Sequence, residues 1–227
     1  MRTAPVLLVH GFASSFERNW REPGWVDLLA DAGRTPIEVD LLGHGNAPKP
    51  HDPAAYADLE AGVADALPAD GEVDAIGFSL GARVLLGLAS RMPERFGRLV
   101  AGGVGTNLLQ AGDHEPVARA IEGLEEPTHP LAQAFSRFAQ TPGNDPLALA
   151  AVMRRPEAPL TAEQLARVTC PVLVVIGDKD FAGPAEPLVE LLPDARLTVL
   201  RGVDHLGTPG DFGFIDAALG FIDAVPA

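Results

Sequence analysis

Short apolar runs alternate with longer amphipathic stretches along most of the chain. Each run is rich in leucine or β-branched residues and is bounded by Gly, Pro or charged residues. Short runs without a polar face are typical of strands that helices cover on both sides. The pattern therefore predicts strands at Val6–Val9, Pro36–Val39, Val73–Ile76, Leu99–Ala101, Val172–Ile176 and Leu197–Leu200.

The stretches between these runs have helical patterns. They predict helices at Trp25–Ala32, Tyr56–Leu67, Leu80–Arg91, Pro187–Leu192 and Phe212–Ala224. Repeated strand–helix–strand units are connected by right-handed crossovers, which place successive strands in parallel. The fold class is therefore α/β, with a mostly parallel, doubly wound sheet of about six strands.

The alternation of predicted strands and helices stops between residues 105 and 167, where no strand pattern occurs. A structureless loop of that length is improbable in a compact domain. Amphipathic pieces divided by Pro and Gly instead predict a helical cap or lid insertion at 105–167, within a core formed by 1–104 and 168–227. The pieces are Pro116–Leu124, Leu131–Ala139, Pro146–Arg154 and Ala162–Val168.

Composition narrows the possible partners. A chain of 227 residues with 47% hydrophobic residues fits one domain with a sizeable core. Its net charge of -14 argues against binding of nucleic acid, and more weakly against strongly anionic substrates. No apolar run reaches the ~18–20 residues of a membrane span. The single Cys170 allows no disulfide within the chain, which fits a cytoplasmic protein. Monomer and homodimer both stay open.

The sharpest chemical signal is Gly77-Phe78-Ser79-Leu80-Gly81, between a predicted strand and a predicted helix. A strand that turns sharply into a helix pushes one side chain out at the carboxyl end of the sheet. The turn leaves little room for side chains two residues before and after, so glycine suits both places. Ser79 is therefore the expected nucleophile, beside the main-chain N–H groups of a helix N-terminus.

With this motif the chain resembles the α/β-hydrolase family. His10-Gly11-Phe12, after the first strand, matches the turn that supplies one N–H group of the family's oxyanion hole. The resemblance implies an oxyanion hole made by the main-chain N–H groups of Phe12 and Leu80. His10 is then a structural histidine of the turn. Asp40-Leu41-Leu42-Gly43-His44-Gly45 resembles a further family turn, whose role we expect to be structural.

The resemblance also implies a Ser–Asp–His triad in that chain order. The acid is expected three residues after Gly177, at Asp180, and His205 matches the family's base. Asp178 is the alternative acid and a better candidate for a turn former. Asp113 is a third, weaker choice, because no carboxylate follows the strand Leu99–Ala101 directly.

Aromatic side chains are predicted to form an apolar substrate pocket. Phe78 and Phe181 flank the expected triad in sequence, and Phe135 and Phe138 lie on one helical face of the insertion. Packing of the insertion onto the core is the alternative role for Phe135 and Phe138. The pocket would suit acyl or aromatic groups.

These features favour a carboxylesterase that cleaves small or apolar esters through an acyl-enzyme. A thioesterase, lactonase or carbon–carbon bond hydrolase would use the same triad, so the substrate stays open. A non-catalytic protein that binds a small molecule is the alternative of a different class. No cofactor is expected, because the dinucleotide fingerprint is missing. No metal is expected either, because His51, His114 and His129 lack ligand spacing.

Overall fold

A computed structural model of the chain describes residues 3–127 and 130–226, without the side chains of residues 130 and 131. Its centre is one six-stranded sheet in the order β2-β1-β3-β4-β5-β6, with every neighbouring pair parallel. This confirms the predicted α/β class. The strands are β1 (Val6–Val9), β2 (Pro36–Val39), β3 (Val73–Phe78), β4 (Phe96–Gly102), β5 (Val172–Gly177) and β6 (Ala195–Leu200).

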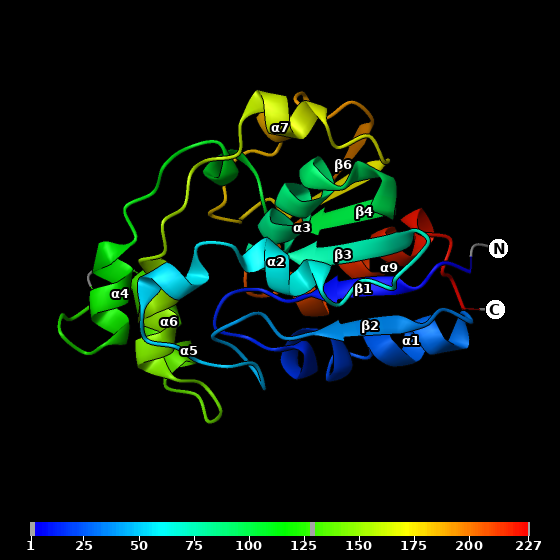
Figure 1. The fold of residues 1–227 in the computed structure, drawn as a ribbon. Coiled ribbons are helices and arrows are strands. Elements are labelled where there is room, and N and C mark those ends of the chain that lie inside the picture. The colour runs from blue at the N-terminus through cyan, green and yellow to red at the C-terminus, as the bar shows by residue number, and fades with distance from the viewer. Residues whose placement is uncertain (1–2, 128–129, 227) are drawn as a thin grey trace.

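Helices cover both faces of the sheet, as Figure 1 shows. Alternate residues of each inner strand enter two separate cores. In β1, Leu7 and Val9 pack towards one face, and Val6 and Leu8 pack towards the other. The first face is covered by α2 (Leu59–Ala64), α3 (Leu80–Arg91) and α8 (Glu186–Val189), and the second by α1 (Trp25–Asp31) and α9 (Phe212–Phe221). Burial on both faces explains why these strands read as continuous apolar runs.

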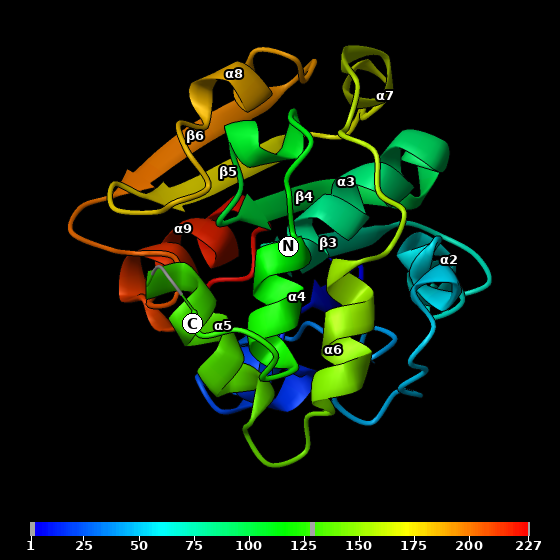
Figure 2. The same ribbon diagram turned by 90° about the vertical axis from the view of Figure 1, so that its left-hand side faces the viewer.

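The segment between β4 and β5 holds η4 (Thr106–Leu108), α4 (Glu115–Ile121), α5 (Pro130–Ala139), α6 (Pro146–Met153) and α7 (Ala162–Ala166). Figures 1 and 2 show α4, α5 and α6 packed together beyond the carboxyl ends of the strands. They share a small apolar core of their own, which includes Val117, Ile121 and Leu149. The two ends of the segment differ from this group, because Leu108 and Leu165 belong to the core of the sheet.

Two local elements differ from the sequence-based expectations. The helix expected at Tyr56–Leu67 is a 3₁₀ turn, η2 (Pro53–Tyr56), followed by α2. The Asp58 side chain accepts a hydrogen bond from Ala61 N, which makes Asp58 an N-cap at which a new helix begins. A short π-helical segment, η1 (Glu17–Arg21), was not predicted at all.

Candidate active site

Ser79 lies at the sharp bend between β3 and α3. Its φ and ψ angles are 51° and -112°, a strained conformation for a residue with a side chain. Ser79 N donates a hydrogen bond to Gly102 O at 2.8 Å, which holds the bend against β4. A Cβ atom on Gly81 would lie 2.1 Å from Val9 O, and one on Gly77 would lie 2.7 Å from the backbone of Ala82. The chain can therefore expose the hydroxyl here only with glycine on both sides.

His205 and Asp180 continue a hydrogen-bonded chain from this hydroxyl. His205 Nε2 lies 2.9 Å from Ser79 Oγ, and His205 Nδ1 lies 2.9 Å from both carboxylate oxygens of Asp180. Asp180 follows β5 and His205 follows β6, so the two parallel strands end at the same edge of the sheet. Since a carboxylate accepts only, Nδ1 carries the proton and Nε2 is free to accept from Ser79. Both side chains are almost fully buried.

The alternative carboxylates have other partners. Asp178 accepts a hydrogen bond from Gly202 N at 2.7 Å and so ties together the loops after β5 and β6. Asp113 is exposed and accepts from Glu115 N at the start of α4. Asp204, beside His205, accepts from Gly207 N within its own turn. None of these three hydrogen bonds involves the imidazole of His205.

The main-chain N–H groups of Leu80 and Phe12 are the two predicted oxyanion donors. Leu80 is the first residue of α3, where an N–H group has no partner inside the helix. In the described part of the chain, neither Leu80 N nor Phe12 N donates a hydrogen bond. The neighbouring Gly11 N does have a partner, Asn19 Oδ1 at 2.8 Å, which fixes the turn that carries Phe12. Both N–H groups are thus without a partner among the described residues, and their role in an oxyanion hole stays a prediction.

A cavity of about 200 Å³ opens beside Ser79 and His205. Three of the predicted substrate-binding residues, Phe78, Phe135 and Phe138, line it. Phe181 does not belong to its lining; its ring packs against the imidazole of His205, with 4.2 Å between ring centroids. The other lining residues are Gly11, Phe12, Ala13, Ser14, Arg18, Asn19, Leu206 and Pro209.

Several residues of this wall were missed from the sequence. Arg18 and Asn19 come from η1, a segment without a recognisable helical or strand pattern. The only available signal was a polar Asn19 directly before the aromatic Trp20. Polar residues next to buried aromatic ones near a motif loop are candidates for the wall of a site, but the pattern alone does not fix their direction.

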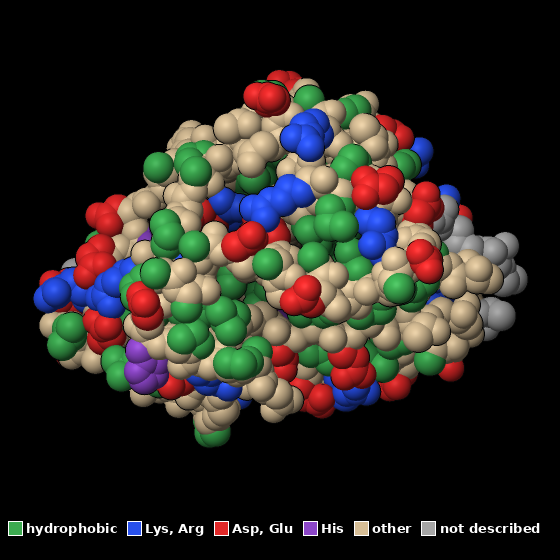
Figure 3. Space-filling model, viewed as in Figure 1, with side chains coloured by type: hydrophobic (Ala, Val, Ile, Leu, Met, Phe, Trp, Pro, Cys, Tyr) green, Lys and Arg blue, Asp and Glu red, His purple; other side chains and the backbone are tan. Residues whose placement is uncertain are grey.

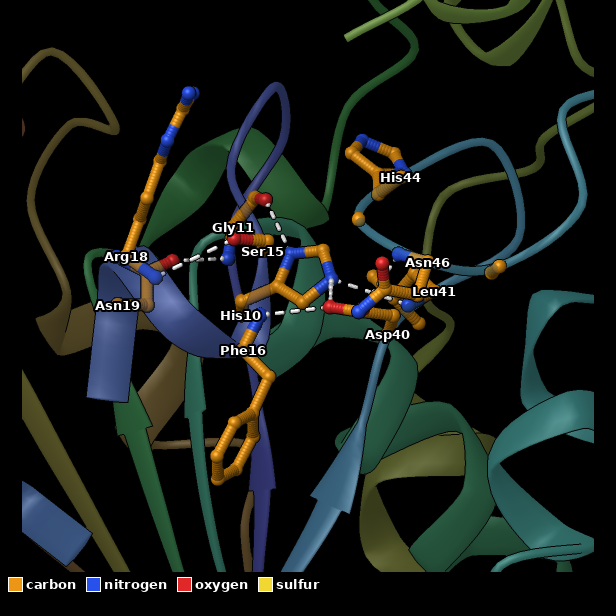
Figure 4. Close-up of polar contacts among 12 residues, drawn as sticks. His10, Gly11, Ser15, Phe16, Arg18, Asn19, Asp40, Leu41, His44 and Asn46 are labelled. Atoms are coloured by element: carbon orange, nitrogen blue, oxygen red, sulfur yellow. Dashed lines mark hydrogen bonds and ion pairs between the residues drawn. The ribbon is translucent and has the colours of Figure 1, made fainter. Parts of the chain in front are cut away.

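His10 and Asp40 organise the loops behind the site rather than the chain of hydrogen bonds at Ser79 (Figure 4). His10 Nδ1 donates to Gly11 O at 2.8 Å, and His10 Nε2 accepts from Leu41 N at 3.0 Å. The Asp40 carboxylate accepts from Phe16 N and Asn46 N, each at 2.7 Å. These contacts link the turn after β1 to the turn after β2.

His44 packs against the ring of His10 and is fully buried. Its Nδ1 donates to Leu42 O at 3.1 Å, while its Nε2 has no hydrogen-bond partner among the described residues. Burial lowers the pKa of His10, and burial together with the nearby His10 lowers the pKa of His44 to about 3. Both rings are therefore uncharged at neutral pH.

In the part of the chain that is described, no group of three His, Cys, Asp or Glu side chains is arranged to hold a metal ion, and His129 lies outside the described residues. No described helix has the length and hydropathy to cross a membrane. On the face in Figure 3, acidic and basic side chains are intermixed, and the basic ones form no stripe across it.

Comparisons with known proteins agree with this geometry. The chain is 30% identical over 236 residues to the pimeloyl-[acyl-carrier protein] methyl ester esterase of Neisseria meningitidis serogroup B, covering 88% of this chain and 85% of that protein. It is 32% identical over 126 residues to the 2-hydroxymuconate semialdehyde hydrolase of Pseudomonas sp., covering 53% of this chain and 41% of that one. A thermophilic esterase from Thermogutta terrifontis has the same fold, with a TM-score of 0.73 and 22% identity over 99% of this chain and 91% of that one. The sequence profile of the alpha/beta hydrolase family matches residues 6–218, and the chain belongs to that family.

Proposed function

We propose that this protein is a serine hydrolase that cleaves small carboxylic esters through an acyl-enzyme. The observation that carries the proposal is the continuous hydrogen-bonded chain from Ser79 Oγ through His205 to Asp180. Membership of a hydrolase family and 30% identity to a methyl ester esterase support the ester as the bond that is cleaved.

In the proposed reaction, Ser79 Oγ attacks the ester carbonyl and its proton passes to His205 Nε2. The carbonyl oxygen becomes an oxyanion, which accepts hydrogen bonds from Phe12 N and Leu80 N. When the carbon–oxygen bond breaks, His205 gives the proton to the departing alcohol. Water then attacks the acyl-enzyme, with His205 as the base, and releases the acid and Ser79. Asp180 holds the tautomer of His205 and stabilises its charged form.

We also assign the role of a lid to α4, α5 and α6. Phe135 of α5 contacts the Phe12 ring edge-on at 5.3 Å between centroids, directly over the turn with the proposed oxyanion donor. A cavity of about 200 Å³ is smaller than the 300–1,000 Å³ range of most ligand pockets, so a small substrate fits best. The apolar side of the wall, which includes Phe78 and Phe138, would face its hydrocarbon part.

Labelling with a fluorophosphonate probe tests the nucleophile. The wild type should react, and Ser79→Ala should neither be labelled nor hydrolyse p-nitrophenyl acetate, with turnover down by at least about 10⁴-fold. Ser90→Ala is the matched control, because Ser90 is a buried serine of the same helix whose hydroxyl donates to Gly87 O. Labelling that persists in Ser79→Ala would overturn the proposal.

A carbon–carbon bond hydrolase is the second candidate, because part of the chain resembles a semialdehyde hydrolase. A substrate panel separates the two. Oxygen esters and thioesters of increasing acyl length would be compared with a vinylogous 1,5-diketone. We expect the highest kcat/KM on short oxygen esters, and faster cleavage of the diketone would favour the second candidate.

A further inference from the structure

Asn19 presents a hydrogen-bond donor to the cavity beside Ser79. The side chain is only 7% exposed and lines this cavity. The orientation of its amide is fixed, because Gly11 N is a donor and must face Oδ1, at 2.8 Å (Figure 4). The NH₂ group is therefore the other end of the amide, and within residues 3–127 and 130–226 it donates to nothing.

Arg18, the preceding residue, supplies positive charge to the same wall. Its guanidinium donates to Pro142 O at 2.9 Å, and no carboxylate of the described residues lies within ion-pair distance of it. Figure 4 shows its side chain extending away from Asp40. By contrast, Arg21 of the same segment pairs with Glu17 and Glu38. A guanidinium has five N–H donors, so most of those of Arg18 stay available.

The lining of this cavity differs in charge from the protein as a whole, which is acidic. The protein has 31 Asp and Glu residues against 17 Lys and Arg residues, yet none of the residues that line this cavity is Asp or Glu. Arg18 also borders a second cavity, whose lining includes Glu17, Glu22, Glu38 and Asp40. In the cavity beside Ser79 the charged member is Arg18, and the buried amide of Asn19 offers donors rather than an acceptor. An NH₂ group that faces a cavity and has no protein partner is free to donate to a ligand. A wall of this kind is complementary to an anion that accepts hydrogen bonds.

We propose that Asn19 Nδ2 and the Arg18 guanidinium bind a carboxylate carried by the ester substrate. The inference rests on the proposed ester hydrolysis and names its substrate class: small esters with a second, ionised carboxyl group. The net charge of -14 repels anions at long range, whereas this local pair of donors attracts them once they enter the cavity. The carboxylate could belong to the acyl part or to the alcohol part of the ester.

Matched substrates test the preference and distinguish these two sources. Monomethyl glutarate carries the carboxylate on the acyl side, and methyl 4-carbamoylbutanoate replaces it by an uncharged amide of the same shape. Acetoxyacetate and acetoxyacetamide form the equivalent pair on the alcohol side. The wild type should show at least a tenfold higher kcat/KM for the anion in one of the two pairs. Equal rates within both pairs would overturn the inference and leave the ester hydrolysis standing.

Variants of η1 identify the residues responsible. Arg18→Gln should lower the anion-to-amide ratio about tenfold or more through KM, and Arg18→Lys should restore part of it. Arg21→Gln is the matched control on the same segment, and its ratio should equal that of the wild type. Asn19→Asp keeps an acceptor for Gly11 N but replaces the free donor by a repelling charge, so it should also lower the ratio. A ratio that survives both Arg18→Gln and Asn19→Asp would refute the assignment.

Direct binding separates failure of this inference from failure of the proposed function. Calorimetry with Ser79→Ala and glutarate measures the carboxylate site without turnover. Binding that Arg18→Gln weakens at least tenfold in the Ser79→Ala background would support the site even if no ester were cleaved. Absence of binding at millimolar glutarate, with each variant shown to be folded by circular dichroism, would count against it.

Discussion

Lowering the pH from 7.5 to 5 should destabilise the protein through His44. This ring is fully buried beneath the turn after β2, and its Nε2 has no partner among the described residues. Desolvation is the main cause that lowers its pKa to about 3, and the neighbouring His10 and Arg155 act in the same direction. The unfolded chain, with a pKa near 6.5, therefore takes up a proton that the folded protein excludes.

The sign and size follow from linkage. Because the folded pKa is the lower one, the full stability is present above pH 6.5 and is lost as the pH falls from there towards 3. At pH 5, protonation of His44 in the unfolded state lowers the free energy of unfolding by about 2 kcal/mol. This follows from about 1.36 kcal/mol for each pH unit below the unfolded pKa. This loss depends little on the pKa of His44 in the folded protein, provided that this pKa lies well below 5. His10, whose pKa is also lowered, adds to the loss.

Urea unfolding at the two pH values measures this loss in the wild type, His44→Asn and Val152→Ala. Asparagine keeps a donor for Leu42 O but does not titrate, so the drop in unfolding free energy between pH 7.5 and 5 should shrink by about 2 kcal/mol. Val152 is buried, and its Cγ2 lies near Gly43 in the same turn, so Val152→Ala destabilises the turn without removing a titrating group. It should keep the wild-type drop. An equal drop in His44→Asn would refute the reasoning.

Two further predictions concern the acid and the bend. Asp180→Asn should lower turnover on p-nitrophenyl acetate by about 10⁴-fold. Asp178→Asn preserves an acceptor for Gly202 N and should lower turnover less than tenfold. Similar losses for the two variants in steady-state kinetics would contradict the assignment. Gly81→Ala should yield little folded protein by circular dichroism, because the added Cβ would meet a carbonyl oxygen at 2.1 Å. Gly220→Ala is the control, because Gly220 is an exposed helical glycine with open space around it, and it should raise the free energy of unfolding by up to about 1 kcal/mol. A folded, active Gly81→Ala would show that the bend tolerates a side chain.

The sequence predicted best those elements whose pattern is forced by burial on both faces. The bounds of β1 match its apolar run, since alternate residues of this covered strand enter two cores. The bend at Ser79 was predictable for a related reason, because its two glycines are required by contacts of 2.1 and 2.7 Å. Ser79, Asp180 and His205 were predicted to meet, and the structure places them in one hydrogen-bonded chain, whose catalytic role stays a proposal.

What the sequence could not predict depends on contacts between distant segments. Asn19 lies in a π-helical turn without periodicity, and only its bond to Gly11 shows which end of its amide faces the cavity. Phe181 directly follows Asp180 and was expected in the substrate wall, but the structure packs it against the imidazole of His205. Leu165 of α7 joins the core of the sheet, and an amphipathic pattern alone does not indicate which apolar surface a helix covers.

The order of the strands explains one further feature of the site. His205 follows β6, which lies three strand spacings from β3, about 14 Å across the sheet, so its loop must pass over the end of β4 to reach Ser79. At that end Gly103 has a φ of 65°, and a Cβ there would lie 2.5 Å from the Phe78 ring and 3.2 Å from His205 Cε1. A side chain at Gly103 would therefore clash with the Phe78 ring and crowd the imidazole. Asp180, which follows β5, lies between the end of β4 and the end of β6 and contacts the imidazole of His205.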